Sequence, residues 1–272
     1  ACAYVDSIPM LVIAGQVTRG TLGWTRGMRQ FGTNELPMTH IMRPVTKWAA
    51  TVADPLSIRD ALERAVHIAM EGRCGPVFLE IPLDVQSAEI EPSTLPAFVP
   101  RDRESAISAK TIEAAVRMIN AAQRPLILAG NGIRLAGAES DFLQFVAYSQ
   151  IPVVTSWNGS DLIDSDDDLC IGRPGVMGDR AGNFAVQNCD LLIVLGSRLS
   201  VPQTGHAQDG YAPNACKIIV DIDGFELQKP VCGSVDMRPD LLVKADVGDF
   251  MRLLLPHFKE LDDTLNPWRQ RC

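Results

Sequence analysis

The sequence has 272 residues, of which 46% are hydrophobic and 21% charged, and its 25 basic and 33 acidic residues give a net charge of −8. This length is sufficient for two packed cores, so it excludes a disulfide-held miniprotein and a disordered tail. Residues 1–100 hold 8 basic and 10 acidic residues, and the remainder hold 17 and 23. Neither part has a basic surplus, so we expect no nucleic-acid partner.

Seven cysteines occur without a Cys-x-x-Cys pair, and the four histidines lack the i, i+4 spacing of a helical metal pair. This pattern predicts reduced thiols and no metal site formed by the protein alone. No apolar run approaches the roughly 20 residues that a membrane span needs, and the first residues lack the order of a signal peptide. We therefore expect a cytoplasmic protein without a membrane partner.

The first strong element is the apolar run 9–15, which predicts a central strand buried on both faces. A glycine-rich segment without periodicity, 16–30, predicts a long loop. Asp54 and Pro55 then begin a helix that ends near Gly72, and the run 76–82 predicts a second buried strand. This order implies a parallel sheet. Because the chain starts at a presumed central strand and ends in a polar tail with an exposed Trp268, we expect a piece of a longer protein.

Residues 91–106 are predicted to be a linker, because they are rich in proline and charge without a sustained period. They separate a domain at 1–90 from a second domain at 107–262, and 263–272 form a tail toward a further domain. In the second domain, apolar runs at 125–129, 152–155, 191–195 and 217–221 alternate with helical segments, the last of which is capped by Asp246. We therefore predict the fold class α/β, with a Rossmann-like second domain.

Three glycine-containing loops, 130–137, 172–183 and 196–199, follow or flank the carboxyl ends of these strands. Doubly wound proteins bind nucleotides at this edge of the sheet. The loop 130–137 resembles the nucleotide-binding pattern Gly-x-Gly-x-x-Gly, but four residues instead of two separate its last two glycines. A tight turn that binds no ligand is therefore the alternative interpretation. Two aspartates end the strand 217–221, where they either accept ribose hydroxyls or cap the next helix. The candidate cofactor-binding residues are Gly130, Gly132, Arg134, Gly175, Val176, Met177, Gly178, Gly196, Ser197, Arg198, Asp221 and Asp223.

Four segments, 6–16, 43–47, 75–86 and 189–198, closely resemble thiamine-diphosphate enzymes of the acetolactate synthase type. The likeness covers nearly the whole chain. It implies that 1–90 are the later part of a pyrimidine-binding (PYR) domain and that 107–262 are the central domain. The family's catalytic glutamate lies before position 1, and its Gly-Asp-Gly motif, which holds Mg2+ and the diphosphate, is absent from this sequence. The resemblance thus implies thiamine diphosphate and Mg2+ in a longer protein and no catalytic residue in this chain.

By the same resemblance, Gln16, Asn34 and Glu35 form part of the active-site wall, although acetolactate synthases have Phe-Gln-Glu where this chain has Thr33-Asn34-Glu35. Family members that hold FAD have Gly-Met-His-Gly where this chain has Gly-Val-Met-Gly at 175–178, so FAD or ADP is a candidate ligand of the central domain. The implied enzyme is a transferase or lyase that forms or cleaves a carbon–carbon bond next to a carbonyl of a small 2-oxo acid, as a homodimer or homotetramer.

Two other functions remain open. The chain could be a nucleotide-binding or structural module without catalysis of its own. It could also be an NAD-dependent oxidoreductase. The sequence lacks an acidic residue at the spacing expected for binding the ribose, which argues against this function.

Overall fold

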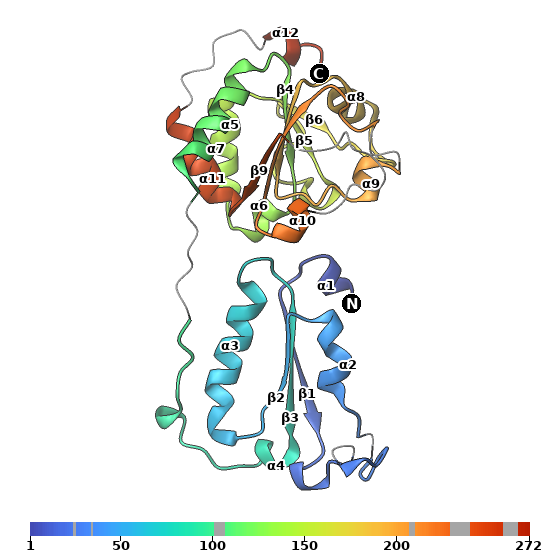
Figure 1. Ribbon diagram of the computed structural model, residues 1–272, viewed down its shortest axis with the longest axis vertical. Helices are drawn as coiled ribbons and strands as arrows, with labels where there is room; N and C mark the ends of the chain where they lie inside the picture. Colours follow the sequence, from blue (N-terminus) through green and yellow to red (C-terminus); the bar gives the residue numbers. More distant parts are fainter. Residues whose placement is uncertain (24–25, 34, 101–106, 207–209, 229–239, 258–265) are drawn as a thin grey trace. The chain divides into compact units, whose positions relative to one another are not determined.

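The computed structural model describes residues 1–23, 26–33, 35–100, 107–206, 210–228, 240–257 and 266–272. The chain forms two compact units, Ala1–Arg103 and Glu104–Cys272. Each unit has its own sheet, and all strand pairs in both sheets are parallel (Figure 1). The predicted α/β class is confirmed.

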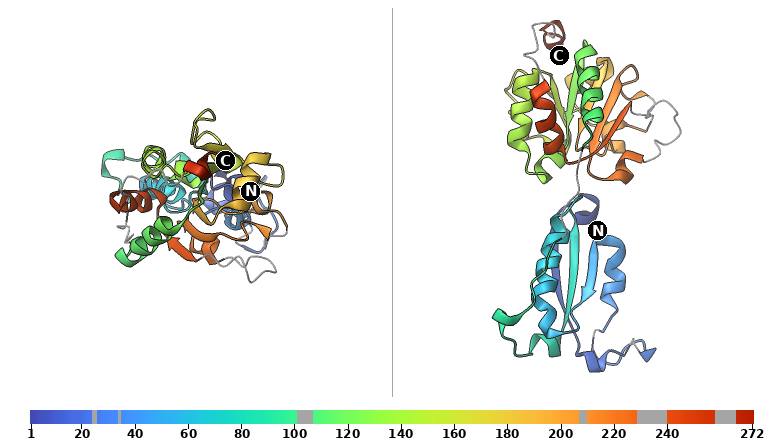
Figure 2. Two further views of the ribbon diagram at one scale, coloured as in Figure 1. Left: turned by 90° about the horizontal axis from the view of Figure 1, so that it is seen from above. Right: turned by 60° about the vertical axis from the view of Figure 1, so that its left-hand side comes forward.

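The first unit is a three-stranded sheet between helices. Its strands lie in the order β1 (Met10–Gln16), β3 (Pro76–Pro82) and β2 (Trp48–Thr51). Helix α3 (Ile58–Met70) covers one face, and α2 (Met38–Met42) lies on the other (Figures 1 and 2). The short elements are α1 (Cys2–Val5), η1 (Arg19–Thr21), η3 (Arg43–Val45), η4 (Pro55–Ser57), α4 (Leu83–Gln86) and η5 (Pro92–Thr94).

The run 9–15 forms the predicted strand, but within the described residues it is neither central nor fully buried. Within the described residues β1 pairs only with β3, so it is an edge strand, and β3 is the central one. Met10 and Ile13 of β1 are 42% and 54% exposed. The apolar run identifies a strand, but its position in the sheet depends on pairing with residues more than 60 positions away, which a local pattern does not encode.

The second unit has a six-stranded sheet in the order β6, β5, β4, β7, β8, β9. Counted from β4, this is the order 3-2-1-4-5-6 of doubly wound nucleotide-binding proteins. The strands are β4 (Pro125–Ala129), β5 (Val153–Thr155), β6 (Cys170–Gly172), β7 (Leu191–Leu195), β8 (Cys216–Asp221) and β9 (Leu241–Lys244). The helices are α5 (Ala109–Ala121), α6 (Gly132–Leu135), α7 (Glu139–Ser149), η6 (Trp157–Gly159), α8 (Arg180–Asn188), α9 (Val201–Thr204), α10 (Gly224–Gln228), α11 (Val247–Leu254), η8 (Leu255–His257) and α12 (Asn266–Arg269).

Alternate residues of the second sheet point into two separate cores. Ile127 and Ala129 pack with residues of α5, α7 and α11, whereas Leu126 and Leu128 pack with residues of α8. Figure 1 shows the first three helices on one side of the sheet and α8 on the other. This arrangement explains why β4 and β7 are continuous apolar runs, since both of their faces are buried.

The expectation that Trp268 is exposed is also wrong. Trp268 lies in α12 and is only 3% exposed, because its ring joins the core on the α8 side of the sheet. Its indole N–H donates to the backbone oxygen of Pro125 at 2.9 Å. A polar, proline-containing tail therefore carries one aromatic anchor that attaches it to the second unit.

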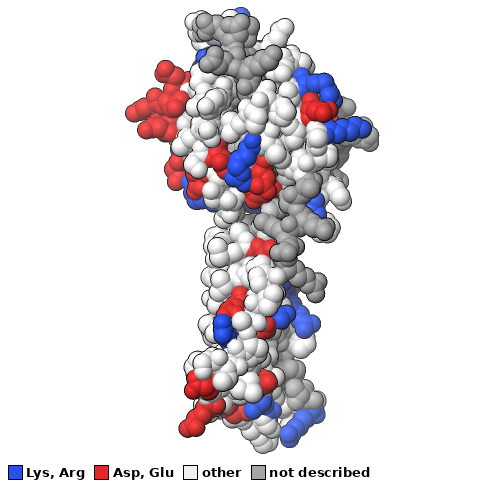
Figure 3. All heavy atoms as spheres, turned by 90° about the vertical axis from the view of Figure 1, so that its left-hand side faces the viewer, with Lys and Arg blue, Asp and Glu red and all other residues white. Residues whose placement is uncertain are grey.

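Basic and acidic side chains are interspersed over the face drawn in Figure 3. No helix within the described ranges combines the length and the apolar character that crossing a membrane requires.

Candidate functional site

Gln16 ends β1 and carries its side-chain amide to the carboxyl edge of the first sheet. Its Nε2 donates to the backbone oxygen of Leu36 and to Glu80 Oε1, each at 2.9 Å. Its Oε1 accepts from the backbone N–H of Val17 at 2.9 Å. Both amide hydrogens are used, so these bonds fix the orientation of the amide.

Glu80 lies within the apolar strand β3 and is only 1% exposed. One carboxylate oxygen accepts from Gln16, and the other accepts from Thr51 Oγ1 at 2.8 Å. Such bonds are required, because a carboxylate removed from water without donors is strongly destabilising. The sequence analysis missed Glu80 and Thr51. The available signal was a single acidic residue inside an otherwise apolar strand.

Glu35 is the second buried carboxylate at this edge and is also 1% exposed. Its Oε2 accepts from the backbone N–H groups of Phe31 and Gly32, at 2.9 and 3.1 Å. These bonds close the loop onto itself. Glu35 therefore organises the backbone immediately before Leu36, the residue that Gln16 contacts.

Two of the three predicted wall residues, Gln16 and Glu35, thus lie in the same part of the first unit, because Gln16 donates to the backbone of Leu36, the residue that follows Glu35. The third, Asn34, lies outside the described residues.

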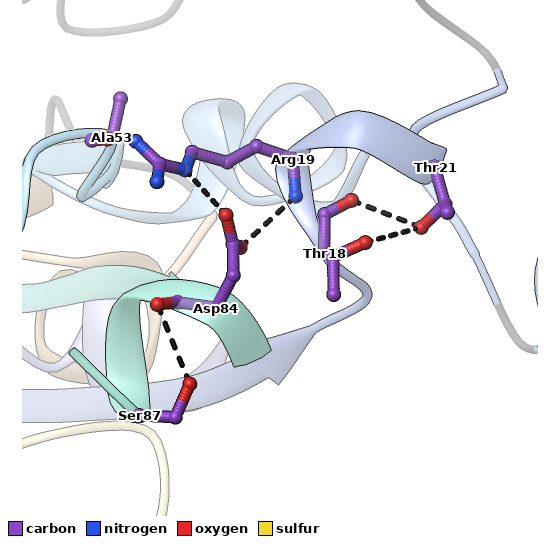
Figure 4. A network of polar contacts seen from close by, with 6 residues as sticks. All are labelled: Thr18, Arg19, Thr21, Ala53, Asp84 and Ser87. Atoms are coloured by element: carbon purple, nitrogen blue, oxygen red, sulfur yellow. Dashed lines mark hydrogen bonds and ion pairs between the residues drawn. The ribbon is translucent and has the colours of Figure 1, made fainter.

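A second set of contacts fixes the beginning of the same loop (Figure 4). The backbone N–H and the Nε of Arg19 donate to the two carboxylate oxygens of Asp84, at 3.0 and 2.7 Å. Arg19 Nη1 also donates to the backbone oxygen of Ala53 at 2.6 Å. The guanidinium and the N–H of Arg19 hold the pKa of Asp84 below its usual value. The loop is therefore anchored where β3 gives way to α4.

In the second unit, three predicted glycines pack backbone against backbone between β4 and β7. A Cβ on Gly130 would lie 2.2 Å from the oxygen of Gly196, and one on Gly132 would lie 2.7 Å from its Cα. The N–H of Gly132 donates to Gly196 O at 3.0 Å, and the N–H of Gly130 donates to Leu195 O at 2.9 Å. Only glycine permits this approach. These two N–H groups join the loops, so a phosphate here would need other donors.

Arg134 also connects loops. Its guanidinium donates to Asn131 Oδ1 at 2.8 Å, to the backbone oxygen of Asn158 at 3.1 Å and to Asp161 Oδ1 at 2.6 Å. The ion pair with Asp161 supplies a counter-charge and ties the loop after β4 to the loop after β5. Asp161 begins the acidic segment 161–168, which contains five aspartates.

The segment 175–178 is held at its base and exposed at its tip. Asn183 both accepts from the N–H of Gly175 and donates to its oxygen, at 3.0 and 3.1 Å. The N–H of Val176 donates to Pro202 O at 2.9 Å. The side chains of Val176 and Met177 are nevertheless 61% and 80% exposed. The loop, which continues to Gly178, therefore presents two apolar side chains from a fixed backbone.

Asp221, the last residue of β8, and Asp223, which follows it, form successive turns. Asp221 Oδ1 accepts from the N–H of Asp223 at 2.8 Å, and Asp223 Oδ1 accepts from the N–H of Phe225 at 2.9 Å. Asp223 therefore makes the capping contact at the start of α10, one of the two roles considered for it. Phe225 is 86% exposed at the same edge. Ser197 and Arg198 follow Gly196 there and are half-buried.

All these loops of the second unit lie at the carboxyl edge of one parallel sheet, on either side of the β4–β7 switch point. That edge is where doubly wound proteins bind nucleotides. The apolar tip at 176–177 and the exposed Phe225 offer surface for a planar ring system.

The described residues do not form a complete site for thiamine diphosphate and Mg2+. In the described parts of the chain, no three His, Cys, Asp or Glu side chains gather as metal ligands. Glu80 and Asp84 bind donors within the first unit, and Glu35 binds its own loop.

Fold and loop arrangement together define an α/β protein whose second unit has the architecture of a nucleotide-binding domain. Residues 112–254 match the family model described as "Thiamine pyrophosphate enzyme, central domain". The chain is 33% identical to a probable acetolactate synthase large subunit of Methanocaldococcus jannaschii, over 94% of this chain and 42% of that protein. It is 38% identical to the acetolactate synthase large subunit of Corynebacterium glutamicum, over 84% of this chain and 36% of that protein. It is 33% identical to the large subunit of acetolactate synthase isozyme 1 of Escherichia coli, over 94% of this chain and 43% of that protein.

The chain belongs to the thiamine pyrophosphate enzymes, and within them to the acetolactate synthase type. It spans less than half the length of these relatives.

Proposed function

We propose that this chain is a section of a larger thiamine-diphosphate enzyme that forms or cleaves a carbon–carbon bond next to the carbonyl of a small 2-oxo acid. The observation that carries this proposal is the similarity to acetolactate synthase large subunits across both units, from 84% to 100% of the chain. When bound, thiamine diphosphate supplies the electron sink for such a reaction, with Mg2+ on its diphosphate.

We infer that the parts responsible for cofactor chemistry lie outside this chain. The relatives are more than twice as long as the segment that matches, and the Gly-Asp-Gly motif expected around Mg2+ does not occur in this sequence. By this proposal residues 1–90 belong to the pyrimidine-binding domain and residues 107–262 are the central domain. The 272-residue chain alone is then inactive.

The contribution of this chain to the active site would be a preorganised wall. Gln16 has its amide fixed by Glu80 and Leu36, so its side chain holds a constant position in this wall. Thr33 and Asn34 replace the Phe and Gln expected for acetolactate synthases, which removes an aromatic side chain from this wall. We therefore propose that the enzyme uses a 2-oxo acid as its first substrate and an acceptor substrate that differs from the one used by acetolactate synthase.

The test is a pair of assays with pyruvate, thiamine diphosphate and Mg2+. The intact protein encoded by the natural gene should consume pyruvate only when thiamine diphosphate is present, whereas residues 1–272 should not. Replacing pyruvate by larger 2-oxo acids, and adding aldehyde acceptors, would identify the substrate pair. Turnover by the 272-residue chain alone would refute the proposed division of labour.

A second candidate function is nucleotide binding by the central unit without catalysis. The order of its six strands favours this function, because the β4–β7 switch point is a nucleotide position in doubly wound sheets. Calorimetric titrations with FAD, ADP and NAD would test it. Saturable binding of FAD or ADP that is weakened by Met177→Asp would support a site at the exposed loop. Absence of binding for all three would eliminate this function.

We propose a homodimer or homotetramer as the working assembly, as the similarity to the large subunits of acetolactate synthases suggests. We also propose a cytoplasmic location, because the six described cysteines are free thiols, as is usual in a reducing compartment.

A further inference from the structure

A pocket of about 190 Å³ lies at the amino edge of the second sheet, opposite the edge that carries the glycine loops. Four segments distant in sequence form it: Arg124, which precedes β4, the carboxyl-terminal half of α8, Asn214, which precedes β8, and the segment around α12. Figure 1 shows α8, α12 and the beginning of β4 at this end of the unit. The pocket is therefore separate from the candidate nucleotide edge.

Two arginines give the pocket a positive charge in a chain whose net charge is −8. Arg124 uses its Nε to donate to the backbone oxygen of Asn188 at 2.7 Å, at the carboxyl end of α8. Within the described residues, the two Nη groups of Arg124 and the whole guanidinium of Arg271 have no hydrogen-bond or ion-pair partner. The neighbouring carboxylate, Asp190, accepts from the backbone N–H groups of Gln123 and Arg124, at 2.9 and 2.8 Å.

Two aromatic rings form the apolar part of the wall. Trp268 is buried, and its hydrogen bond to Pro125 O fixes the plane of the indole. Phe184, on α8, is 46% exposed. The side-chain amide of Asn214 has no hydrogen-bond partner among the described residues, so it offers both a donor and an acceptor to a ligand. Charge, flat apolar surface and an amide thus converge on one small volume.

We propose that this pocket binds a small planar carboxylate, with its carboxylate on Arg124 and Arg271 and its apolar part against Phe184 and Trp268. Guanidinium groups recognise carboxylates through paired, charge-assisted hydrogen bonds. Aromatic side chains favour flat apolar groups. A volume of about 190 Å³ is below the range typical of drug-sized sites, which excludes a nucleotide as the occupant. This inference goes beyond the proposed reaction and does not depend on it.

Benzoate is the probe for the test, followed by two-dimensional ¹⁵N–¹H NMR of the 272-residue protein. The indole N–H signal of Trp268, assigned with Trp268→Phe, should shift saturably, whereas that of Trp48 in the first unit should not. Arg271→Gln should weaken binding about tenfold, as expected for loss of a charge-assisted hydrogen bond. The matched control is Arg117→Gln, which removes the same charge from the exposed face of α5 and should leave binding unchanged.

Three results would overturn the inference. The first is absence of a saturable shift with benzoate in a protein whose spectrum shows it to be folded. The second is equal binding of benzyl alcohol, which has the ring without the charge. The third is an identical response to benzoate in Arg271→Gln and in the unchanged protein. Inorganic phosphate distinguishes the contribution of the arginines from that of the aromatic wall, because it carries a negative charge but has no ring. It should therefore bind more weakly than benzoate.

Discussion

The two sheets are both parallel, but they differ in how completely they are covered. Every residue of β4 and β7 in the second sheet is buried. In the first sheet β3 is almost completely buried, whereas β2 is half-buried throughout and β1 alternates between half-buried and exposed positions. Because parallel sheets are normally covered on both faces, the first unit derives less stability from burial than the second. Stability is therefore distributed unevenly along the chain.

The largest expected effect follows from separating the units between Arg103 and Glu104. Residues 104–272 should unfold cooperatively on heating, because their two cores enclose both faces of a six-stranded sheet. Residues 1–103 should show a lower and broader transition with exposed apolar surface. Circular dichroism with a dye that binds apolar surface measures both properties. A sharper transition at a higher temperature in residues 1–103 would reverse the comparison.

The next effect concerns the close loop contact in the more stable unit. Gly130→Ala places a Cβ 2.2 Å from the oxygen of Gly196, so backbone must move. We expect a loss of roughly 3 kcal/mol in the free energy of unfolding, measured by urea denaturation. The matched control is Gly210→Ala, where nothing lies within 4 Å of the new Cβ. A loss below about 0.5 kcal/mol for Gly130→Ala would mean that the two loops are not packed as described.

A smaller effect is expected from the polar network of the first unit. Glu80→Ala leaves the amide of Gln16 and the hydroxyl of Thr51 without their buried acceptor. The expected loss is about 2 kcal/mol, together with broadening or shift of the Gln16 side-chain NH2 signals. Glu80→Gln keeps the volume and one acceptor and should lose less. If the Gln16 signals were the same in all three proteins, Glu80 would have no role in orienting that amide.

The smallest effect concerns Asp84 at the anchored loop. Its folded-state pKa lies below the ordinary value, chiefly because of the hydrogen bond from the Arg19 side chain. The stabilisation is therefore complete above the ordinary Asp pKa of about 3.9 and is lost as the pH falls through the lower folded value. Carboxyl ¹³C NMR should show the pKa of Asp84 returning toward its ordinary value in Arg19→Gln. An unchanged titration curve in that variant would exclude Arg19 as the cause.

Elements whose signals are local could be predicted from the sequence. The strands β4 and β7 have the predicted bounds, since each is an apolar run without interruption. Asp246 caps α11 through the N–H groups of Gly248 and Asp249, as its position before an apolar period indicates. The short strands β2, β6 and β9 were missed, although β5, which is equally short, was predicted from the apolar run 152–155. Four residues or fewer do not establish a period, so such strands are identified from the sequence inconsistently.

Features that depend on distant partners could not be predicted. Glu80 is stabilised by residues 64 and 29 positions away, and Trp268 by a carbonyl 143 positions away. The place of β1 beside β3 likewise depends on pairing with residues that are distant in sequence. At the candidate site, the glycines lie at the sheet edge because of the strand order, which the sequence pattern indicates. Their packing against each other joins loops that are distant in sequence, so no local pattern predicts it.

Release of labelled carbon dioxide from [1-¹³C]pyruvate is the most direct measurement of whether this chain works as a section of a larger thiamine-diphosphate enzyme. The protein expressed from its natural gene should release label only with thiamine diphosphate and Mg2+ present, and residues 1–272 should release none. Release by the 272-residue chain, or a thiamine-diphosphate-independent release by the natural protein, would contradict this conclusion.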